Sequence, residues 1–369
     1  MSCFVADYGV TGQDAVAMED SIMQKDKPVT AGSKILDNFM SPFDATVVSR
    51  LLGSKYDFAG KTTMDEFGIF HLAGKQSEIL GAVKAVADGV SGYALCNDLF
   101  GRYRRQAAEN ACCYIHPTYG TVSRFGLIPL ASSMDQIGVV CKNLPDGFAL
   151  LTQIAGKDPH DGAMFPEEKF CYASVNKDIR IGIPKSIVQK AEAPNREAVE
   201  NFAGKFQATD IELEHFEVYK QVMYILSCAE ISHNINRYDG VKFGYRAPSF
   251  RGVNDLYIKT RSESFGFDVK LSAIMGAMVL SQNQYVPYYE KAMKIRRLIK
   301  ESLRFDSYDI IVLPCTISED PYENLSLYAL PALAGLPVVS FMHNGHGIQL
   351  IANVKSESLL LSAWEVCTA

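Results

Sequence analysis

The strongest restriction on the fold comes from three short segments near the C-terminus. They read YDIIVLPC (residues 308–315), LPVVSF (336–341) and HGIQLIAN (346–353), and each is a mostly apolar run about as long as one strand. A strand that is apolar on both sides has to be covered on both faces, as in sheets that lie between layers of helices. The C-terminal third therefore predicts buried strands at the centre of an α/β domain.

Helical and strand-like segments alternate over the rest of the chain. Residues 44–54 and 77–89 have apolar side chains at helical spacing and end at Gly53 and Gly89, whereas RIGIPK (180–185) is typical of a strand. Helical periodicity dominates residues 218–305. Because strands precede and follow these helices, we predict one domain over residues 1–369, with a helical excursion at about 195–305 from a single sheet.

Charge and cysteine usage narrow the class of protein. A net charge of -6 gives no general attraction to nucleic acid, so any contact with RNA would be local or shared with a partner. No segment reaches the ~18 apolar residues of a membrane span. The nine cysteines are scattered and the histidines lack ligand spacing, which predicts a cytoplasmic protein without a metal or other cofactor.

Six motifs in a fixed order carry a resemblance to a known family. They are GKTTMDEF (60–67), HPTYGTVSRFGLIPLASSMDQIG (116–138), RIGIPK (180–185), RYDGVKFGYR (237–246), TRSESFG (260–266) and YEKAMKIRRLIK (289–300). The chain resembles the amidase signature family, in particular its branch of A subunits of glutamyl-tRNA(Gln)/aspartyl-tRNA(Asn) amidotransferases. The resemblance implies a central mixed β-sheet covered on both faces by helices, and an amidase that releases ammonia from glutamine. It also implies that the N-terminal helical stretch of the family is missing here.

The family's catalytic machinery is a serine nucleophile, a second serine in a cis peptide bond and a lysine. A serine hydroxyl is a weak nucleophile, so it needs a neighbouring base. Matched position by position, the lysine falls on Glu19, the second serine on Glu78 and the nucleophile on Arg102. The residues before the nucleophile, which form the oxyanion turn in the family, are replaced by Leu99 and Phe100. All three catalytic residue types are therefore replaced.

The replaced side chains have two possible arrangements. Glu19, Glu78 and Arg102 could form a hydrogen-bonded ion network that fills the pocket, or the loops could have rearranged so that all three face solvent. Carboxylates in the neighbouring motifs, Asp65, Glu66 and Asp135, are expected to act as structural anchors.

Three other residues are candidates for substrate binding by the same resemblance. Arg296 matches a family arginine that holds the glutamine carboxylate, and Tyr238 and Tyr245 match positions that flank that pocket. The alternative, which we favour from the sequence, places Arg296 on a solvated basic helix face with Arg297 and Lys300.

Three functions remain open at this stage. We expect a catalytically inactive homologue that acts as a scaffold or regulatory subunit beside B- and C-like amidotransferase subunits, and that contacts tRNA only through them. The alternative is a working glutamine-hydrolysing subunit that uses another nucleophile, Cys96 or Ser77. A decaying paralogue without a selected function is the third.

Overall fold

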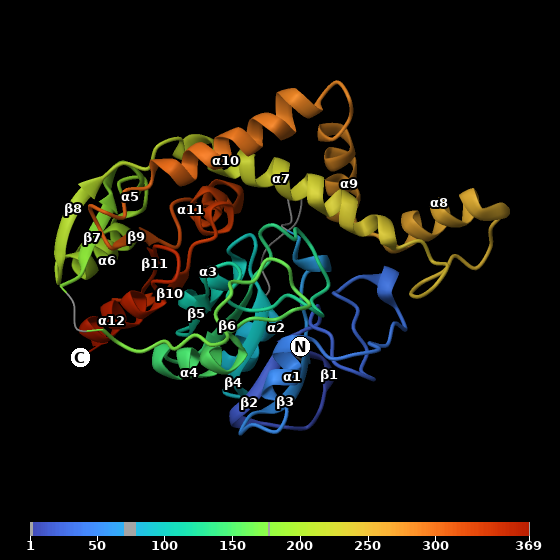
Figure 1. Ribbon diagram of the computed structural model, residues 1–369, viewed down its shortest axis with the longest axis horizontal. Coiled ribbons are helices and arrows are strands. Elements are labelled where there is room, and N and C mark those ends of the chain that lie inside the picture. The colour runs from blue at the N-terminus through green and yellow to red at the C-terminus, as the bar shows by residue number, and fades with distance from the viewer. Residues whose placement is uncertain (1–2, 70–78, 176–177, 369) are drawn as a thin grey trace.

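The computed structural model describes residues 3–69, 79–175 and 178–368 (Figure 1). Eleven strands in the described residues form one mixed sheet in the order β1-β3-β2-β4-β6-β5-β10-β11-β9-β7-β8. They are β1 Phe4–Asp7, β2 Gly12–Glu19, β3 Asp57–Thr62, β4 Ser91–Asn97, β5 Cys113–His116, β6 Ile137–Cys141, β7 Arg180–Pro184, β8 Gln207–Ile211, β9 Ile310–Pro314, β10 Val338–His343 and β11 His346–Ala352. The predicted α/β fold with a mixed sheet is confirmed.

Helices surround this sheet. They are α1 Thr46–Leu51, α2 Gly81–Ala87, α3 Arg102–Glu109, α4 Leu144–Ile154, α5 Lys185–Val188, α6 Ala193–Ala203, α7 Tyr219–Asn234, α8 Gly252–Ser264, α9 Phe267–Val279, α10 Lys291–Ser302, α11 Pro321–Ala334 and α12 Glu357–Thr368. Short helical turns are η1 Lys34–Leu36, η2 Glu66–Gly68, η3 Phe216–Val218, η4 Ile235–Arg237 and the π-helical η5 Tyr285–Glu290. No helix in this part of the chain combines the length and apolarity needed to cross a membrane.

Strand β9 shows why the sheet is covered on both faces. Ile311 and Leu313 join the core that includes residues of α7, α10 and α11, whereas Ile310 and Val312 join the core that includes residues of α1, α4, α6 and α12. Successive side chains of a strand point to opposite faces, so two apolar cores require a strand that is apolar throughout. The three C-terminal segments form β9, β10 and β11, as predicted from their sequence.

The region expected to be a helical excursion contains one strand. Strand β8 pairs in parallel with β7 at the sheet edge, and its residues QATDI are mostly exposed. Its sequence has no apolar run, which is why the hydrophobic pattern did not predict it. Helix α7 then packs against α9, α10 and α11, and α8 extends away from the sheet (Figure 1).

Two central strands position the candidate functional site. Strand β2 lies parallel to β4, and they end at Glu19 and Asn97. The carboxyl ends of parallel strands meet at one edge of a sheet, and helix α3 begins a few residues after β4. Glu19 and the start of α3 are therefore brought to the same place.

Candidate functional site

A small cavity lies where β2, β4 and α3 meet. Its volume is about 20 Å³, which is room for about one water molecule. The described residues that line it are Glu19, Asp65, Gly68, Ile69, Leu80, Asn97, Asp98, Leu99, Phe100, Arg102 and Tyr103. The structure thus brings together two of the predicted positions, Glu19 and Arg102, while Glu78 lies outside the described residues.

The start of α3 is fixed by Asp98. Its carboxylate accepts hydrogen bonds from the backbone N–H groups of Tyr103 and Arg104, each at 3.0 Å, and from Arg104 Nε at 2.9 Å. Gly101 caps the helix with a φ of 78°, and a Cβ at this position would overlap the ring of Tyr328. These contacts hold the first residue of the helix, Arg102, against the cavity.

The turn before α3 is filled by apolar side chains. Leu99 and Phe100 are 2% and 5% exposed and belong to the core that includes residues of α7 and α11. In the family this turn offers backbone N–H groups to an oxyanion, which needs open space in front of them. Here the side chains anchor the turn in the core.

Glu19 is a buried acid. Its carboxyl accepts hydrogen bonds from the Asn97 backbone N–H at 2.6 Å, from Ser21 Oγ at 3.1 Å and from the Tyr103 hydroxyl at 3.2 Å. The side chain is 1% exposed, and burial raises the pKa of the Glu19 carboxyl to about 8. Glu19 is therefore mostly protonated and neutral at neutral pH. A carboxyl in either protonation state also cannot supply the positive charge of the lysine that the family resemblance implies at this position.

Arg102 forms an ion pair with Asp65, which lies in the GKTTMDEF motif (60–67). The two side chains are 12% and 19% exposed, so the pair is largely shielded from water. Burial lowers the pKa of Arg102, but a guanidinium stays protonated in proteins. Asp65 was expected to be a structural anchor, and the structure places it in the site itself, as the described acid partner of Arg102.

The alternative hypothesis names two nucleophiles, Cys96 and Ser77, and Cys96 is the one that lies among the described residues. Cys96 lies inside β4 with no exposed surface, and burial raises the pKa of its thiol well above the usual range. A thiol without exposure and without a thiolate is a poor nucleophile. Ser77 lies outside the described residues.

Arg296 lies in a different pocket from Glu19 and Arg102. Its guanidinium donates from Nε to the Leu333 carbonyl at 2.7 Å, and to Ser133 at Oγ (2.9 Å) and at the carbonyl (3.1 Å). It is thus tied to the end of α11 and to the loop that holds Ser133, unlike the neighbouring Arg297, which is exposed and pairs with Glu301.

The two tyrosines have separate surroundings as well. Tyr238 is buried and stacks on Phe67 with 5.4 Å between ring centroids. Tyr245 donates its hydroxyl to Glu263 at 2.5 Å, and the Lys34 ammonium lies over its ring. Substrate binding by Arg296, Tyr238 and Tyr245 stays a prediction.

The expected anchors make the contacts of structural residues. Asp135 accepts hydrogen bonds from Asn97 Nδ2 at 2.9 Å and from the N–H groups of Leu130 and Ala131. Glu66 accepts from Ser33 Oγ and from the Gly266 N–H. In the part of the chain that the structure describes, no group of three His, Cys, Asp or Glu side chains could hold a metal ion.

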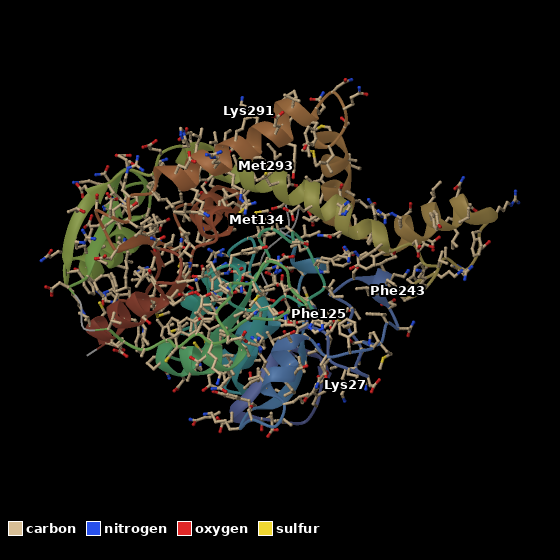
Figure 2. All side chains as sticks on the ribbon, viewed as in Figure 1. Lys27, Phe125, Met134, Phe243, Lys291 and Met293 are labelled. Atoms are coloured by element: carbon tan, nitrogen blue, oxygen red, sulfur yellow. The ribbon has the colours of Figure 1, made fainter. Side chains whose placement is uncertain are left out.

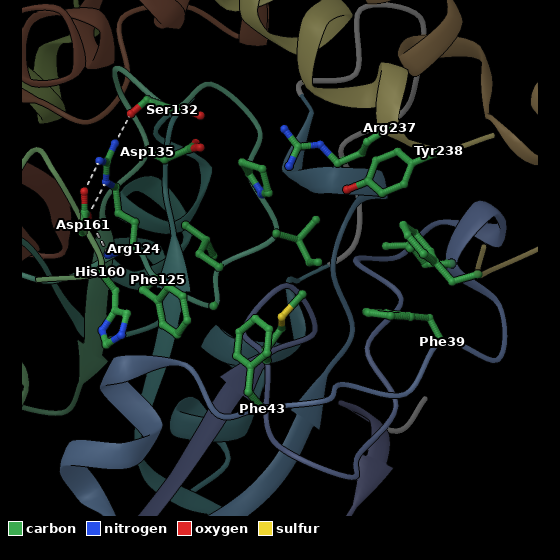
Figure 3. Close-up of a pocket in the computed structure, with 17 residues that line it drawn as sticks. Phe39, Phe43, Arg124, Phe125, Ser132, Asp135, His160, Asp161, Arg237 and Tyr238 are labelled. Carbon is green, nitrogen blue, oxygen red and sulfur yellow. Dashed lines mark hydrogen bonds and ion pairs between the residues drawn. The ribbon is translucent and has the colours of Figure 1, made fainter. Parts of the chain in front are cut away.

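A larger cavity of about 390 Å³ was not predicted from the sequence (Figure 3). Aromatic side chains of Phe39, Phe43, Phe125 and Tyr238 surround it, and Arg124 pairs with Asp161 at its side. These aromatic residues come from segments that lie far apart in the sequence. The local motifs therefore did not indicate that the residues meet around one cavity.

Comparison with known proteins identifies the family of this fold. The sequence profile named Amidase matches residues 15–79 and 80–333. This chain belongs to the amidase family. The two matched stretches meet beside Glu78, where the family has its Gly/Ser-rich loop, and together they include Glu19 and Arg102.

Relatives in this family include A subunits of glutamyl-tRNA(Gln) amidotransferases. The chain is 37% identical to that of Listeria monocytogenes, with 94% of this chain and 81% of the relative covered. It is 34% identical to that of Lactobacillus johnsonii, with 88% and 76% covered. The crystal structure of the Thermotoga maritima subunit superposes with a TM-score of 0.73 at 26% identity, covering 94% of this chain and 81% of that one. The resemblance predicted from the six motifs is confirmed.

Proposed function

We propose that this amidase family member is a catalytically inactive relative of the amidotransferase A subunits, and that it acts as a scaffold or regulatory subunit. The observation that carries the proposal is the occupied site: the buried Glu19 and the Arg102–Asp65 ion pair around a cavity of about 20 Å³. Ligand pockets are usually on the order of 300 Å³ or larger. A glutamine side chain has no room beside these residues.

The chemistry of the lining residues supports inactivity. The described residues that line the cavity include no serine, threonine or cysteine. The hydroxyl that is present, on Tyr103, donates to Glu19, and burial raises the pKa of Tyr103 well above its usual range. The family's acyl transfer needs a hydroxyl or thiol that an adjacent base activates, and those residues offer no serine, threonine or cysteine for this role.

The remaining parts of the proposal rest on the family. The relatives are named as A subunits, which supports B- and C-like subunits as partners of this chain and contact with tRNA only through them. We propose that residues 1–369 act as one domain, because one sheet runs through the described residues. The proposed location is the cytoplasm.

Glutamine hydrolysis by the purified chain tests the proposal. Ammonia release is measured for the chain alone and together with purified B- and C-like subunits, with an active A subunit from a relative as the positive control. We expect background ammonia in both cases. Release above background that Ser77→Ala or Cys96→Ala abolishes would establish the alternative, an active subunit with a non-standard nucleophile.

A further inference from the structure

The cavity of about 390 Å³ is too large to be a packing defect. Protein interiors are close-packed, and voids larger than a water molecule are few. Residues within three segments line it, 23–43, 124–161 and 237–243, and we call it the aromatic cavity. At roughly 30 Å³ for each molecule of liquid water, it has room for about 13 non-hydrogen atoms, the size of a two-ring aromatic molecule. Its volume is therefore that of a small-molecule site.

Two pairs of phenylalanine rings form the walls of the aromatic cavity. Phe43 stacks on Phe125 with 5.0 Å between ring centroids. Phe39 and Phe243 form the second pair, with 5.1 Å between centroids. Although Phe125 and Phe243 are far apart in the sequence, they lie in the same part of the molecule (Figure 2). Phe43 and Phe243 are each 38% exposed, so their rings still offer faces and edges to a further flat ring.

Two hydrogen-bond donors point into the aromatic cavity. Figure 3 shows the Arg237 guanidinium and the Tyr238 hydroxyl turned toward its middle. Arg237 is held in place by Asn234, because its Nε donates to the Asn234 carbonyl at 2.8 Å and its Nη2 to Asn234 Oδ1 at 2.9 Å. Among the described residues, neither Arg237 Nη1 nor the Tyr238 hydroxyl has a hydrogen-bond partner. Burial raises the pKa of Tyr238 to about 12, so its hydroxyl keeps its proton and can donate.

The charges of the lining favour an anion. The Arg124 guanidinium is paired with Asp161, with 2.8 Å between Nε and Oδ2. The Asp135 carboxylate accepts three hydrogen bonds from its own surroundings. Arg237, in contrast, forms no ion pair with an acid in the described part of the chain. The positive charge left for a ligand is therefore that of Arg237, and carboxylates are among the anions that a guanidinium binds best.

We infer that the aromatic cavity binds a small aromatic carboxylate, whose ring lies between the phenylalanine walls and whose carboxylate accepts from Arg237 and Tyr238. This site is separate from the position of the replaced catalytic residues, because the described residues that line the two cavities have no member in common. Arg296, to which the resemblance assigns a glutamine carboxylate, lines neither of them. The inference goes beyond the proposed function and does not depend on whether the chain hydrolyses glutamine.

Isothermal titration of the full chain with β-naphthoate tests this inference. Methyl β-naphthyl ketone is the matched neutral ligand, because a methyl group takes the place of one carboxylate oxygen and the ring system is the same. The full chain should bind the acid at least about tenfold more tightly than the ketone, since only the acid carries a charge for Arg237. Glutamine should not displace β-naphthoate.

Two variants with matched controls separate the charge from the aromatic walls. Arg237→Gln should bind acid and ketone alike, and Phe43→Ala should weaken both ligands about tenfold. The controls are Arg246→Gln and Phe250→Ala, which make the same exchanges at exposed residues outside the lining and should leave both affinities within about twofold. The thermal midpoint of each variant is measured first, and the comparison of acid with ketone on the full chain needs no variant.

Several outcomes would overturn the inference. It is refuted if the full chain does not bind β-naphthoate at up to about 1 mM, if the ketone binds as tightly as the acid, or if each control weakens binding as much as its test variant. Displacement of β-naphthoate by glutamine would assign the aromatic cavity to glutamine instead. The ammonia assay is independent. A chain that binds β-naphthoate and releases ammonia contradicts only the proposed function, and an inactive chain that fails to bind it contradicts only this inference.

Discussion

Replacing Glu19 by glutamine should make the protein more stable at neutral pH. A glutamine has the shape of a protonated glutamate, so its Oε1 can accept from the Asn97 N–H and its Nε2 can donate to the Tyr103 oxygen. The neutral form is the one that burial favours, because the pKa of Glu19 rises to about 8. The variant keeps the hydrogen bond from the Asn97 N–H, reverses the direction of the one with Tyr103 and loses the proton linkage.

The expected size follows from the linkage between protons and folding. Between an ordinary pKa of 4.5 in the unfolded chain and about 8 in the folded protein, the folded state binds the Glu19 proton more tightly. The free energy of unfolding of the wild type therefore falls as pH rises through this window. At about 1.4 kcal/mol for each pH unit, the advantage of Glu19→Gln should grow by about 2–3 kcal/mol from pH 5 to pH 7. Other buried acids titrate in both proteins, so the difference between them isolates Glu19.

Urea unfolding at several pH values from 5 to 8 measures this difference. The matched control is Glu200→Gln, which makes the same exchange at an exposed carboxyl on α6 and leaves Glu19 in place. A Glu19→Gln difference that stays flat over the same range would refute the reasoning, since it would mean that Glu19 is ionised in the folded protein.

Two further predictions concern the same site. Arg102→Ser removes the partner of a largely buried carboxylate, so it should lower the free energy of unfolding by about 1–3 kcal/mol. The variant should still release no ammonia from glutamine. A stable variant that hydrolyses glutamine would show that Arg102 alone blocks an intact site. Thiol labelling by iodoacetamide in the native protein, read by mass spectrometry, should modify the exposed Cys171 and spare Cys96, and labelling of Cys96 at the same rate would contradict its burial.

The order of side chains was enough to predict most of the sheet. In β9 the apolar residues 310–313 contribute side chains to two hydrophobic cores. A strand that is apolar on both sides is expected where both faces of a sheet are covered. Strand β8 was missed because its residues QATDI lie exposed at the edge. β8 is a strand because its backbone pairs with β7, and this pairing does not produce a pattern of apolar side chains in the sequence.

In the candidate site, too, one contact was predicted from the sequence and another was not. The meeting of Glu19 and Arg102 was predicted from the family motifs, and it occurs because β2 and β4 are parallel neighbours that end at one edge. The pairing of Arg102 with Asp65 was not predicted, because it joins segments whose approach depends on how β3 and α3 are placed around those strands.

From the family resemblance, the sequence predicted which residue types stand at the catalytic positions, and hence that the family's nucleophile and lysine are replaced. It could not establish their charge states. A carboxyl is ionised or protonated according to the water it loses and the donors it meets, and Glu19 meets donors from β4 and α3 that lie far away in the chain. Side-chain identity is local, whereas solvation is a property of the folded whole, so only the tertiary structure makes Glu19 a neutral acid.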